Sequence, residues 1–107
     1  MSASDISGYT ELFFQTADEH IAKIEEELKE VLSSSNSQEE IEDIYRRVHS
    51  LKGSSSVMGY HVISDMCTTI GDLIHPSEGV LTISSANIGE VTNLIGGLKN
   101  KLQEVRL

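Results

Sequence analysis

The residues best suited to chemistry lie in the stretch VHSLKGSSSVMGY, residues 48–60. In a helix, Lys52 and Gly53 follow His49 by three and four residues, so both lie beside its imidazole on one face. A neutral imidazole is a competent nucleophile near pH 7, and a lysine ammonium offers a point charge to phosphate oxygens. Because Gly53 adds no side chain, it leaves room for a second protein above the ring. The pattern therefore predicts a histidine that accepts a phosphoryl group from another protein's active site.

Each of these residues also has an ordinary interpretation. A lone exposed histidine on a helix is most often a plain surface residue. Close packing between helices is an alternative role for Gly53, and Ser54, Ser55 and Ser56 suit an ordinary polar surface. A glycine inside a helix, as Gly53 would be, lowers the stability of that helix by about 1 kcal/mol relative to alanine. The combination at helical spacing, rather than any single residue, favours the phosphoryl acceptor.

Four amphipathic segments are expected to position these residues. The first spans residues 5–32, the second begins at Ser37, the third spans residues 61–74, and the fourth begins at Ser84 or Ser85. Ser37 and Glu40 form a capping-box pattern, and Gly59 suits a helix C-cap. The polar breaks are SSSNS, residues 33–37, and HPSEG, residues 75–79. Such segments with short loops predict an all-α protein, an antiparallel four-helix bundle that forms one domain over residues 1–107.

Apolar residues recur at the i, i+3/i+4 spacing of a buried helix face in every segment. The stripes are Tyr9, Phe13, Ala17, Ile21, Ile24, Leu28 and Val31; Ile41, Ile44, Val48, Leu51, Ser55 and Met58; Ile63, Met66, Ile70 and Leu73; and Ile88, Val91, Ile95, Leu98, Leu102 and Val105. His49 falls outside the stripe of its own segment. We therefore expect it to be exposed.

Composition excludes several classes of function. The 17 acidic residues outnumber the 8 basic ones, which gives a net charge of −9 and disfavours binding to nucleic acid or to an anionic membrane. A single cysteine, Cys67, excludes an internal disulfide, and the four histidines lack metal-ligand spacing. No stretch resembles a membrane span or a signal peptide, so we expect a cytoplasmic domain without a metal or cofactor of its own.

Two longer matches accompany the histidine motif. HSLKGSSSVMG, residues 49–59, resembles the H-x-x-K-G-x-x-x-x-x-G signature of histidine phosphotransfer (HPt) domains. DISGYTELFFQTADE, residues 5–19, and YHVISDMCTTIGDLI, residues 60–74, resemble the N-terminal phosphotransfer domain of chemotaxis-type histidine kinases (CheA). The resemblance implies an HPt-like bundle in which His49 is phosphorylated and Lys52 assists electrostatically. Gly53 and Gly59 are then the structural glycines of the motif.

The third segment departs from that family at two positions. Chemotaxis kinases usually present a histidine and, three residues later, a glutamate towards the phosphorylated ring, and Thr68 and Gly71 stand at these places. Asp65, Asp72 and Thr68 are the alternatives for the missing ring partner. Ser56 lies near the azimuth of His49 on the second segment. We predict that Ser56, Gly59 and Thr68 are supporting residues of the site.

The resemblance also implies partners. An ATP- and Mg²⁺-binding histidine kinase catalytic domain, in cis or in trans, would phosphorylate His49, and a response-regulator receiver aspartate would take the phosphoryl group. The domain itself is a phosphocarrier without an ATP site, and we expect it to be part of a longer histidine kinase. Two alternatives remain open: an intermediate of a multistep phosphorelay, and a helical adaptor that is not phosphorylated.

The remaining histidines and the cysteine have structural interpretations. We expect His20 to be partly buried at the edge of the core. His61 and His75 fall at helix ends, where a histidine is usually solvated or caps the helix. Cys67 is expected to be a small buried apolar residue.

Charged residues complete the predictions. The acidic run of residues 25–27 reads as a solvated helix face. Arg46 and Arg47, one turn before His49, are suited either to contacts with an acidic partner or to i, i+4 pairs with Glu42 and Asp43.

Overall fold

Four helices form the described part of the chain. The computed structural model describes the backbone of residues 3–34, 37–75 and 80–106, with side chains from residue 8 onwards. The helices are α1 (Ala3–Ser33), α2 (Gln38–Val57), α3 (His61–Ile74) and α4 (Ile88–Arg106). Parts of the two predicted breaks, residues 35–36 and 76–79, lie outside the described residues.

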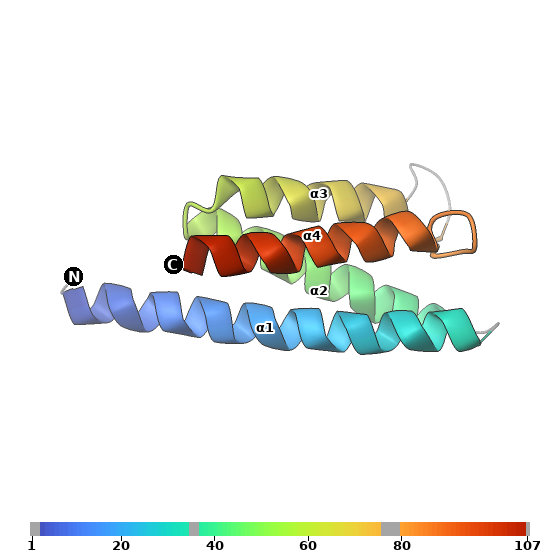
Figure 1. Cartoon of the computed structure of the whole chain (residues 1–107), viewed down its shortest axis with the longest axis horizontal. Coiled ribbons are helices and arrows are strands. Elements are labelled where there is room, and N and C mark those ends of the chain that lie inside the picture. Colours follow the sequence, from blue (N-terminus) through green and yellow to red (C-terminus); the bar gives the residue numbers. More distant parts are fainter. Residues whose placement is uncertain (1–2, 35–36, 76–79, 107) are drawn as a thin grey trace.

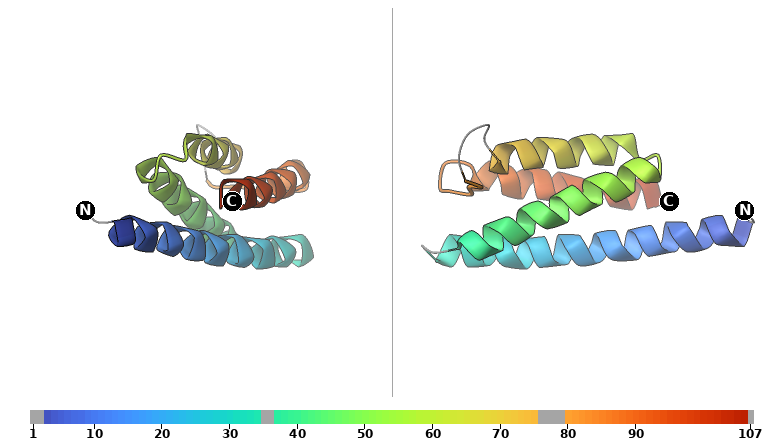
Figure 2. Two further views of the ribbon diagram at one scale, coloured as in Figure 1. Left: turned by 60° about the vertical axis from the view of Figure 1, so that its left-hand side comes forward. Right: turned by 180° about the vertical axis from the view of Figure 1, so that it is seen from behind.

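The helices run alternately in opposite directions, so that consecutive helices are antiparallel (Figure 1). Helix α1 packs against α2 and α4, and α3 packs against the same two helices from the other side. The end-on view in Figure 2 shows α2 and α4 between these two outer helices. This is the antiparallel four-helix bundle that the sequence predicted.

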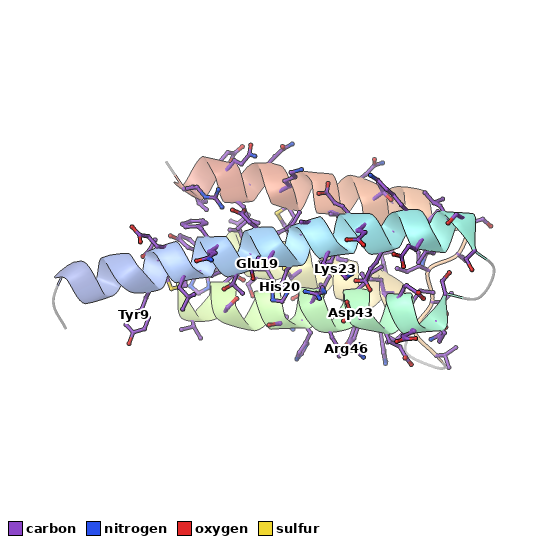
Figure 3. All side chains as sticks on the ribbon, turned by 90° about the horizontal axis from the view of Figure 1, so that it is seen from below. Tyr9, Glu19, His20, Lys23, Asp43 and Arg46 are labelled. Atoms are coloured by element: carbon purple, nitrogen blue, oxygen red, sulfur yellow. The ribbon has the colours of Figure 1, made fainter. Side chains whose placement is uncertain are left out.

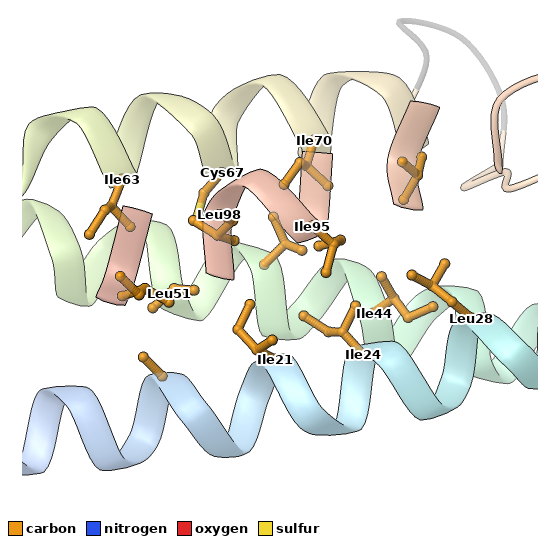
Figure 4. Packing of buried hydrophobic residues seen from close by; sticks show 14 of the residues in the cluster. Ile21, Ile24, Leu28, Ile44, Leu51, Ile63, Cys67, Ile70, Ile95 and Leu98 are labelled. Atoms are coloured by element: carbon orange, nitrogen blue, oxygen red, sulfur yellow. The ribbon is translucent and has the colours of Figure 1, made fainter. Parts of the chain in front are cut away.

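One hydrophobic core lies inside the bundle, and aliphatic residues from all four helices meet in it (Figure 4). Burial of each such side chain stabilises the fold by about 1.5–3 kcal/mol. The fully buried large residues are Ile24, Ile44, Val48, Leu51, Ile63, Cys67, Ile70, Ile74, Val91, Ile95, Leu98 and Leu102. The predicted stripes supply nearly all of this core.

The stripe of α1 is buried only where the other helices cover it. Helix α1 has 31 residues against 14–20 in the others, and its first turns project beyond the bundle (Figures 1 and 3). Tyr9 lies on this projection and is 58% exposed, so its predicted place in the core was wrong. An apolar groove of about 730 Å³ runs beside it, lined by Leu12 and Phe13 of α1 and by Val57 and Met58 of α2.

The stripe of α3 is rotated slightly from the predicted one. Cys67 and Ile74 are fully buried, whereas Met66 and Leu73 are only partly buried against the core. Both choices satisfy helical periodicity. Contact with α2 and α4 on two sides decides which residues lie deepest.

The start of α2 lies where it was predicted, but its capping box does not form. Ser37 is the N-cap residue, yet its side chain makes no cap hydrogen bond. Its hydroxyl donates instead to the Ser34 carbonyl at 3.3 Å. Serine bonds readily to nearby backbone, and here that local bond replaces the cap.

Helix α4 starts at Ile88, three or four residues later than predicted. The Asn87 side chain accepts a hydrogen bond from the Ser84 amide at 2.8 Å and donates to the carbonyls of Leu73 and Thr82, both at 3.2 Å. These bonds hold the segment before Ile88 in a turn and tie it to the end of α3. The Ser84 hydroxyl also accepts from the Ala86 amide at 3.2 Å and the Ile88 amide donates to the Ser84 carbonyl at 2.9 Å, so a helical turn opens at the predicted Ser84 although the regular helix begins at Ile88.

Helix α2 ends in a glycine-dependent cap. Gly59 has φ +82°, the left-handed region that disfavours a Cβ. The Tyr60 amide donates to the Ser55 carbonyl at 2.8 Å, and the Gly59 amide donates to the Ser56 carbonyl at 3.1 Å. These two bonds form a Schellman motif that reverses the chain into α3. Gly59 is therefore the predicted C-terminal cap.

Alanine substitution should separate the two glycines of the motif. Gly59→Ala should lower the free energy of unfolding by about 1–2 kcal/mol, because the left-handed conformation is costly with a Cβ. Gly53→Ala should raise it by about 1 kcal/mol, because this glycine is helical and a Cβ there meets no atom within 4 Å. Urea denaturation of both variants measures the difference. Destabilisation by Gly53→Ala would contradict the open surroundings of that residue.

Candidate functional site

A small hollow lies at the interface of α2 and α3, beside His49. Its volume is about 50 Å³, which suits one or two water molecules and is far below that of a small-molecule site. The lining residues are Tyr45, Val48, His49 and Lys52 of α2 and Cys67, Thr68, Gly71 and Asp72 of α3. A molecule of nucleotide size therefore does not fit between the helices beside His49.

The register of α2 turns His49 outward. Val48 and Leu51 are each 1% exposed and face the core, and His49 between them is exposed. Lys52 is partly buried and borders the hollow, one turn further along. The structure thus brings His49 and Lys52 to one surface, as their spacing predicted.

Gly53 has no packing role in the described part of the chain. A Cβ at this position would meet no atom within 4 Å, and its backbone is ordinary helix. Close helix packing, the alternative interpretation of this glycine, is therefore wrong. What remains is an exposed stretch of bare backbone one turn beyond His49.

The α3 side of the hollow carries little that can hold the imidazole. Thr68 donates its hydroxyl proton to the Ser64 carbonyl of its own helix at 3.1 Å, and Gly71 has no side chain. Asp72 borders the hollow, whereas Asp65 does not. Within residues 8–34, 37–75 and 80–106, no hydrogen bond to the His49 ring is found.

Of the other residues singled out in the sequence, Ser56, Gly59 and His61 lie away from the hollow, whereas Cys67 lines it. Ser56 is exposed near the end of α2, where its carbonyl serves the C-cap together with Gly59. His61 is the exposed first residue of α3. Cys67 is fully buried, and this burial raises the pKa of its thiol to about 12, against a smaller lowering effect of the Lys52 charge. The thiol is therefore protonated, as befits a core residue.

Sequence reasoning placed Tyr45 on the same side of the helix as His49 but gave it no role, and the structure stacks it on the imidazole. The Tyr45 and His49 rings are stacked with centroids 6.2 Å apart and planes 21° apart. The same tyrosine contacts the His75 ring at 5.6 Å between centroids. The i, i+4 spacing of Tyr45 and His49 is a signal that could have found the first contact, but the second depends on the packing of α3 against α2.

A polar cluster joins α1 to α2, and Figure 3 shows two of its members, His20 of α1 and Asp43 of α2. Arg47 donates to Asp43 at 2.8 Å, lies 3.1 Å from the His20 Nδ1 atom, and approaches Glu27 Oε1 at 3.8 Å. Glu27 is only 6% exposed, and its Oε1 has no hydrogen-bond partner among the described residues. The solvated face predicted for residues 25–27 is therefore wrong at Glu27, because this residue faces α2.

The arginine pairs also differ in part from the prediction. Arg47 pairs with Asp43 at the expected i, i+4 spacing, and its guanidinium is only partly exposed. Arg46 pairs with Asp43 at 3.3 Å rather than with Glu42. His20 is partly buried at the core edge, as predicted.

Burial shifts the protonation of this cluster. Burial, together with the neighbouring Asp43 carboxylate, raises the pKa of Glu27 to about 7. Hydrogen bonding with Glu27 first, and with Arg47, lowers the pKa of Asp43 to about 2. Burial and the Arg47 charge lower the pKa of His20. Glu27 and Asp43 therefore titrate as one coupled pair.

In the regions that the structure describes, no group of three or more His, Cys, Asp or Glu side chains could hold a metal ion. None of the described helices is long and apolar enough to cross a bilayer.

Fold and site together define a four-helix bundle with an exposed histidine beside a lysine and an unpacked glycine. The family model described as "Hpt domain" matches residues 8–106. The chain therefore belongs to the Hpt family of phosphotransfer domains, whose members work with phosphorelay partners.

The relatives narrow the class further. The chain is 28% identical to "Chemotaxis protein CheA" of Halobacterium salinarum over 99 residues, which are 92% of this chain and 15% of that protein. It is 27% identical to the protein of that name from Salmonella typhimurium over 101 residues, and 30% identical to that from Bacillus subtilis over 89 residues. These matches cover 94% and 83% of this chain and 14% and 12% of the relatives. The chain is thus an Hpt domain distantly related to CheA and spans about one seventh of the length of those proteins. No solved structure matches it significantly.

The charge cluster predicts a pH-dependent stability. The folded chain keeps the Glu27 proton up to about pH 7, whereas the unfolded chain releases it near 4.5. The folded state therefore binds more protons in this window, and the contribution of Glu27 to stability falls as the pH rises, by on the order of 2 kcal/mol. His20, whose pKa is lowered, contributes with the opposite sign below pH 6.5.

The Glu27→Gln variant isolates this contribution. Relative to the variant, the wild-type chain should lose stability steadily as urea denaturation is repeated from pH 4.5 to 7. Glu26→Gln is the matched control, because the neighbouring Glu26 side chain is 62% exposed and should leave the profile unchanged. Parallel profiles for wild type and Glu27→Gln would show that Glu27 is not held protonated.

Proposed function

We propose that His49 carries a phosphoryl group from an ATP-dependent histidine kinase catalytic domain to the receiver aspartate of a response regulator. The observation that carries the proposal is the exposed imidazole with Lys52 beside it and open space over Gly53, in a chain of the Hpt family. Among the described residues nothing packs against Gly53, and this supports a role of the glycine in partner access.

Two transfers at phosphorus describe the reaction. A lone pair on one ring nitrogen of His49 attacks the γ-phosphorus of ATP, the P–O bond to the β-phosphate breaks, and ADP leaves. The Lys52 ammonium offsets negative charge on the oxygens in transfer. A receiver carboxylate oxygen then attacks the same phosphorus, and the P–N bond breaks to return the imidazole.

The partner supplies everything else that the reaction needs. The hollow of about 50 Å³ is far too small for a nucleotide. ATP and Mg²⁺ are therefore assigned to a kinase catalytic domain, in the same chain or another, and the chain described here is its substrate domain. Since ATP is a cytoplasmic nucleotide, we place the relay in the cytoplasm.

A multistep phosphorelay intermediate is the second candidate. One observation favours it: no described side chain donates to or accepts from the His49 ring, so the ring lacks the carboxylate partner implied by the resemblance to chemotaxis kinases. In this version a phosphorylated receiver is the donor. The similarity to CheA over 92% of the chain favours the kinase as donor.

Phosphate uptake from two donors in parallel tests the proposal. A chemotaxis-type kinase core with ATP should label the wild-type chain with an acid-labile, alkali-stable phosphate, and the His49→Gln variant should carry none. The variant should lose less than about 0.5 kcal/mol of stability, because His49 is exposed.

The donor decides between the two candidates. Label only from a phosphorylated receiver would replace the kinase by a relay as the source. Label from neither cognate donor, or equal label in His49→Gln, would reject a phosphorylated His49 and leave an adaptor.

A bulky residue at Gly53 tests the clearance beside the ring. Gly53→Leu should slow transfer by on the order of 100-fold, because a side chain there holds the partner's active site away from the imidazole. The chain should remain folded, since a Cβ at this position meets no atom within 4 Å. Rates with the kinase core measure the effect. Gly53→Ala is the matched control with a much smaller loss, and an unimpaired Gly53→Leu variant would contradict the role of the bare backbone.

A further inference from the structure

The imidazole of His49 has one described contact that can orient it, the ring of Tyr45. The two rings are stacked, with centroids 6.2 Å apart and planes 21° apart. Both side chains border the hollow between α2 and α3, and no hydrogen bond to the imidazole is found in the described part of the chain. Among the interactions described for the His49 ring, the stacking on Tyr45 is therefore the one that can restrict its rotation.

Tyr45 is itself held from the side of α3. Its ring lies 5.6 Å from the His75 ring, at the C-terminal end of that helix. A Cβ built on Gly71 would lie 3.7 Å from the Tyr45 Cε2 atom, which is ordinary van der Waals distance, so the tyrosine ring borders the space beside this glycine. Tyr45 is also partly buried against the core. Contacts with His75 and with the core restrict the Tyr45 ring, so this ring can serve as a platform, that is, a surface against which the His49 imidazole stacks.

Stacking suits an acceptor histidine for a chemical reason. A ring contact through the face restricts rotation of the imidazole but leaves both nitrogens free at its edge. A hydrogen bond from one nitrogen also fixes a ring, but it occupies that nitrogen. Aromatic pairs prefer such offset arrangements and gain free energy beyond simple burial.

We propose that Tyr45 is the positioning residue for His49, and that His75 and the bare backbone at Gly71 hold Tyr45 in place. The tyrosine does not touch the phosphoryl group. It narrows the orientations of the imidazole, so that a larger fraction of encounters with the donor is productive. This inference rests on the proposed phosphorylation of His49.

Substitution at position 45 tests the inference in the 107-residue chain. Tyr45→Leu should lower the kcat of a cognate kinase core for this chain by about three- to tenfold, the range that corresponds to loss of one aromatic pair, with KM unchanged. The rate of phosphorylation by phosphoramidate, a small donor without a docking surface, should fall by the same factor. Tyr45→Phe keeps the ring and should restore both rates.

Two further readouts separate positioning from loss of structure. Tyr60→Leu is the matched control, because Tyr60 is also partly buried and contacts two aromatic rings, of Phe13 and Phe14, away from His49. It should lose stability without a loss of rate. The proton resonances of the His49 ring should shift in Tyr45→Leu but not in Tyr45→Phe or Tyr60→Leu, as expected for a ring current from residue 45.

The results with these variants decide whether Tyr45 positions His49. Wild-type rates in a folded Tyr45→Leu variant, a change in KM alone, or an equal loss in Tyr60→Leu would overturn the role of Tyr45. If Tyr45→Leu fails to fold, His75→Leu replaces it: His75 is exposed, and a lower rate in this variant supports the platform whereas an unchanged rate overturns it. A wild-type chain that takes phosphate from no donor refutes the proposed function itself, and the ring-proton shifts then report only whether the two rings are stacked.

Discussion

The helical register of α2 is the constraint on which the rest of the structure depends. Val48 and Leu51 pack into the core, and the same rotation turns His49 to the surface and brings Lys52 to the edge of the hollow. The register is secured in the middle of the helix and at its C-terminal end. Arg47 ties the helix to α1 through Glu27 and His20, and Gly59 ends it in a Schellman motif. A rotation of one residue would turn His49 toward the core and expose Val48 or Leu51.

Gly53 of α2 lowers the stability of the helix while it leaves the surface beside His49 open. Gly53 weakens the helix by about 1 kcal/mol relative to alanine, and nothing in the described structure compensates for it locally. The stability comes instead from the aliphatic core on the opposite face, which all four helices share. In the proposed function, the bare backbone at Gly53 leaves room for the partner's active site to close over the His49 ring.

The region around the imidazole shows how a bundle can orient a side chain without a hydrogen bond. Thr68 bonds within its own helix, and Gly71 contributes only backbone. Tyr45 occupies the adjoining space and stacks against the ring. Orientation through an aromatic face leaves both ring nitrogens at the open edge. The bundle thereby combines restriction of the ring with free access to its reactive atoms.

The sequence by itself determined the four helices, their approximate ends, and the exposure of His49 beside Lys52 and Gly53. Each of these follows from spacing within one helix, where residues three or four apart share a face. Only the tertiary structure decided that Glu27 is buried and that Tyr9 projects beyond the core. It also decided that the regular part of α4 begins directly after Asn87. It also decided that Tyr45 lies between His49 and His75. These features depend on how far one helix extends past another and on which side chains meet across the interface, and contacts between residues distant in sequence leave no periodic signal in the chain.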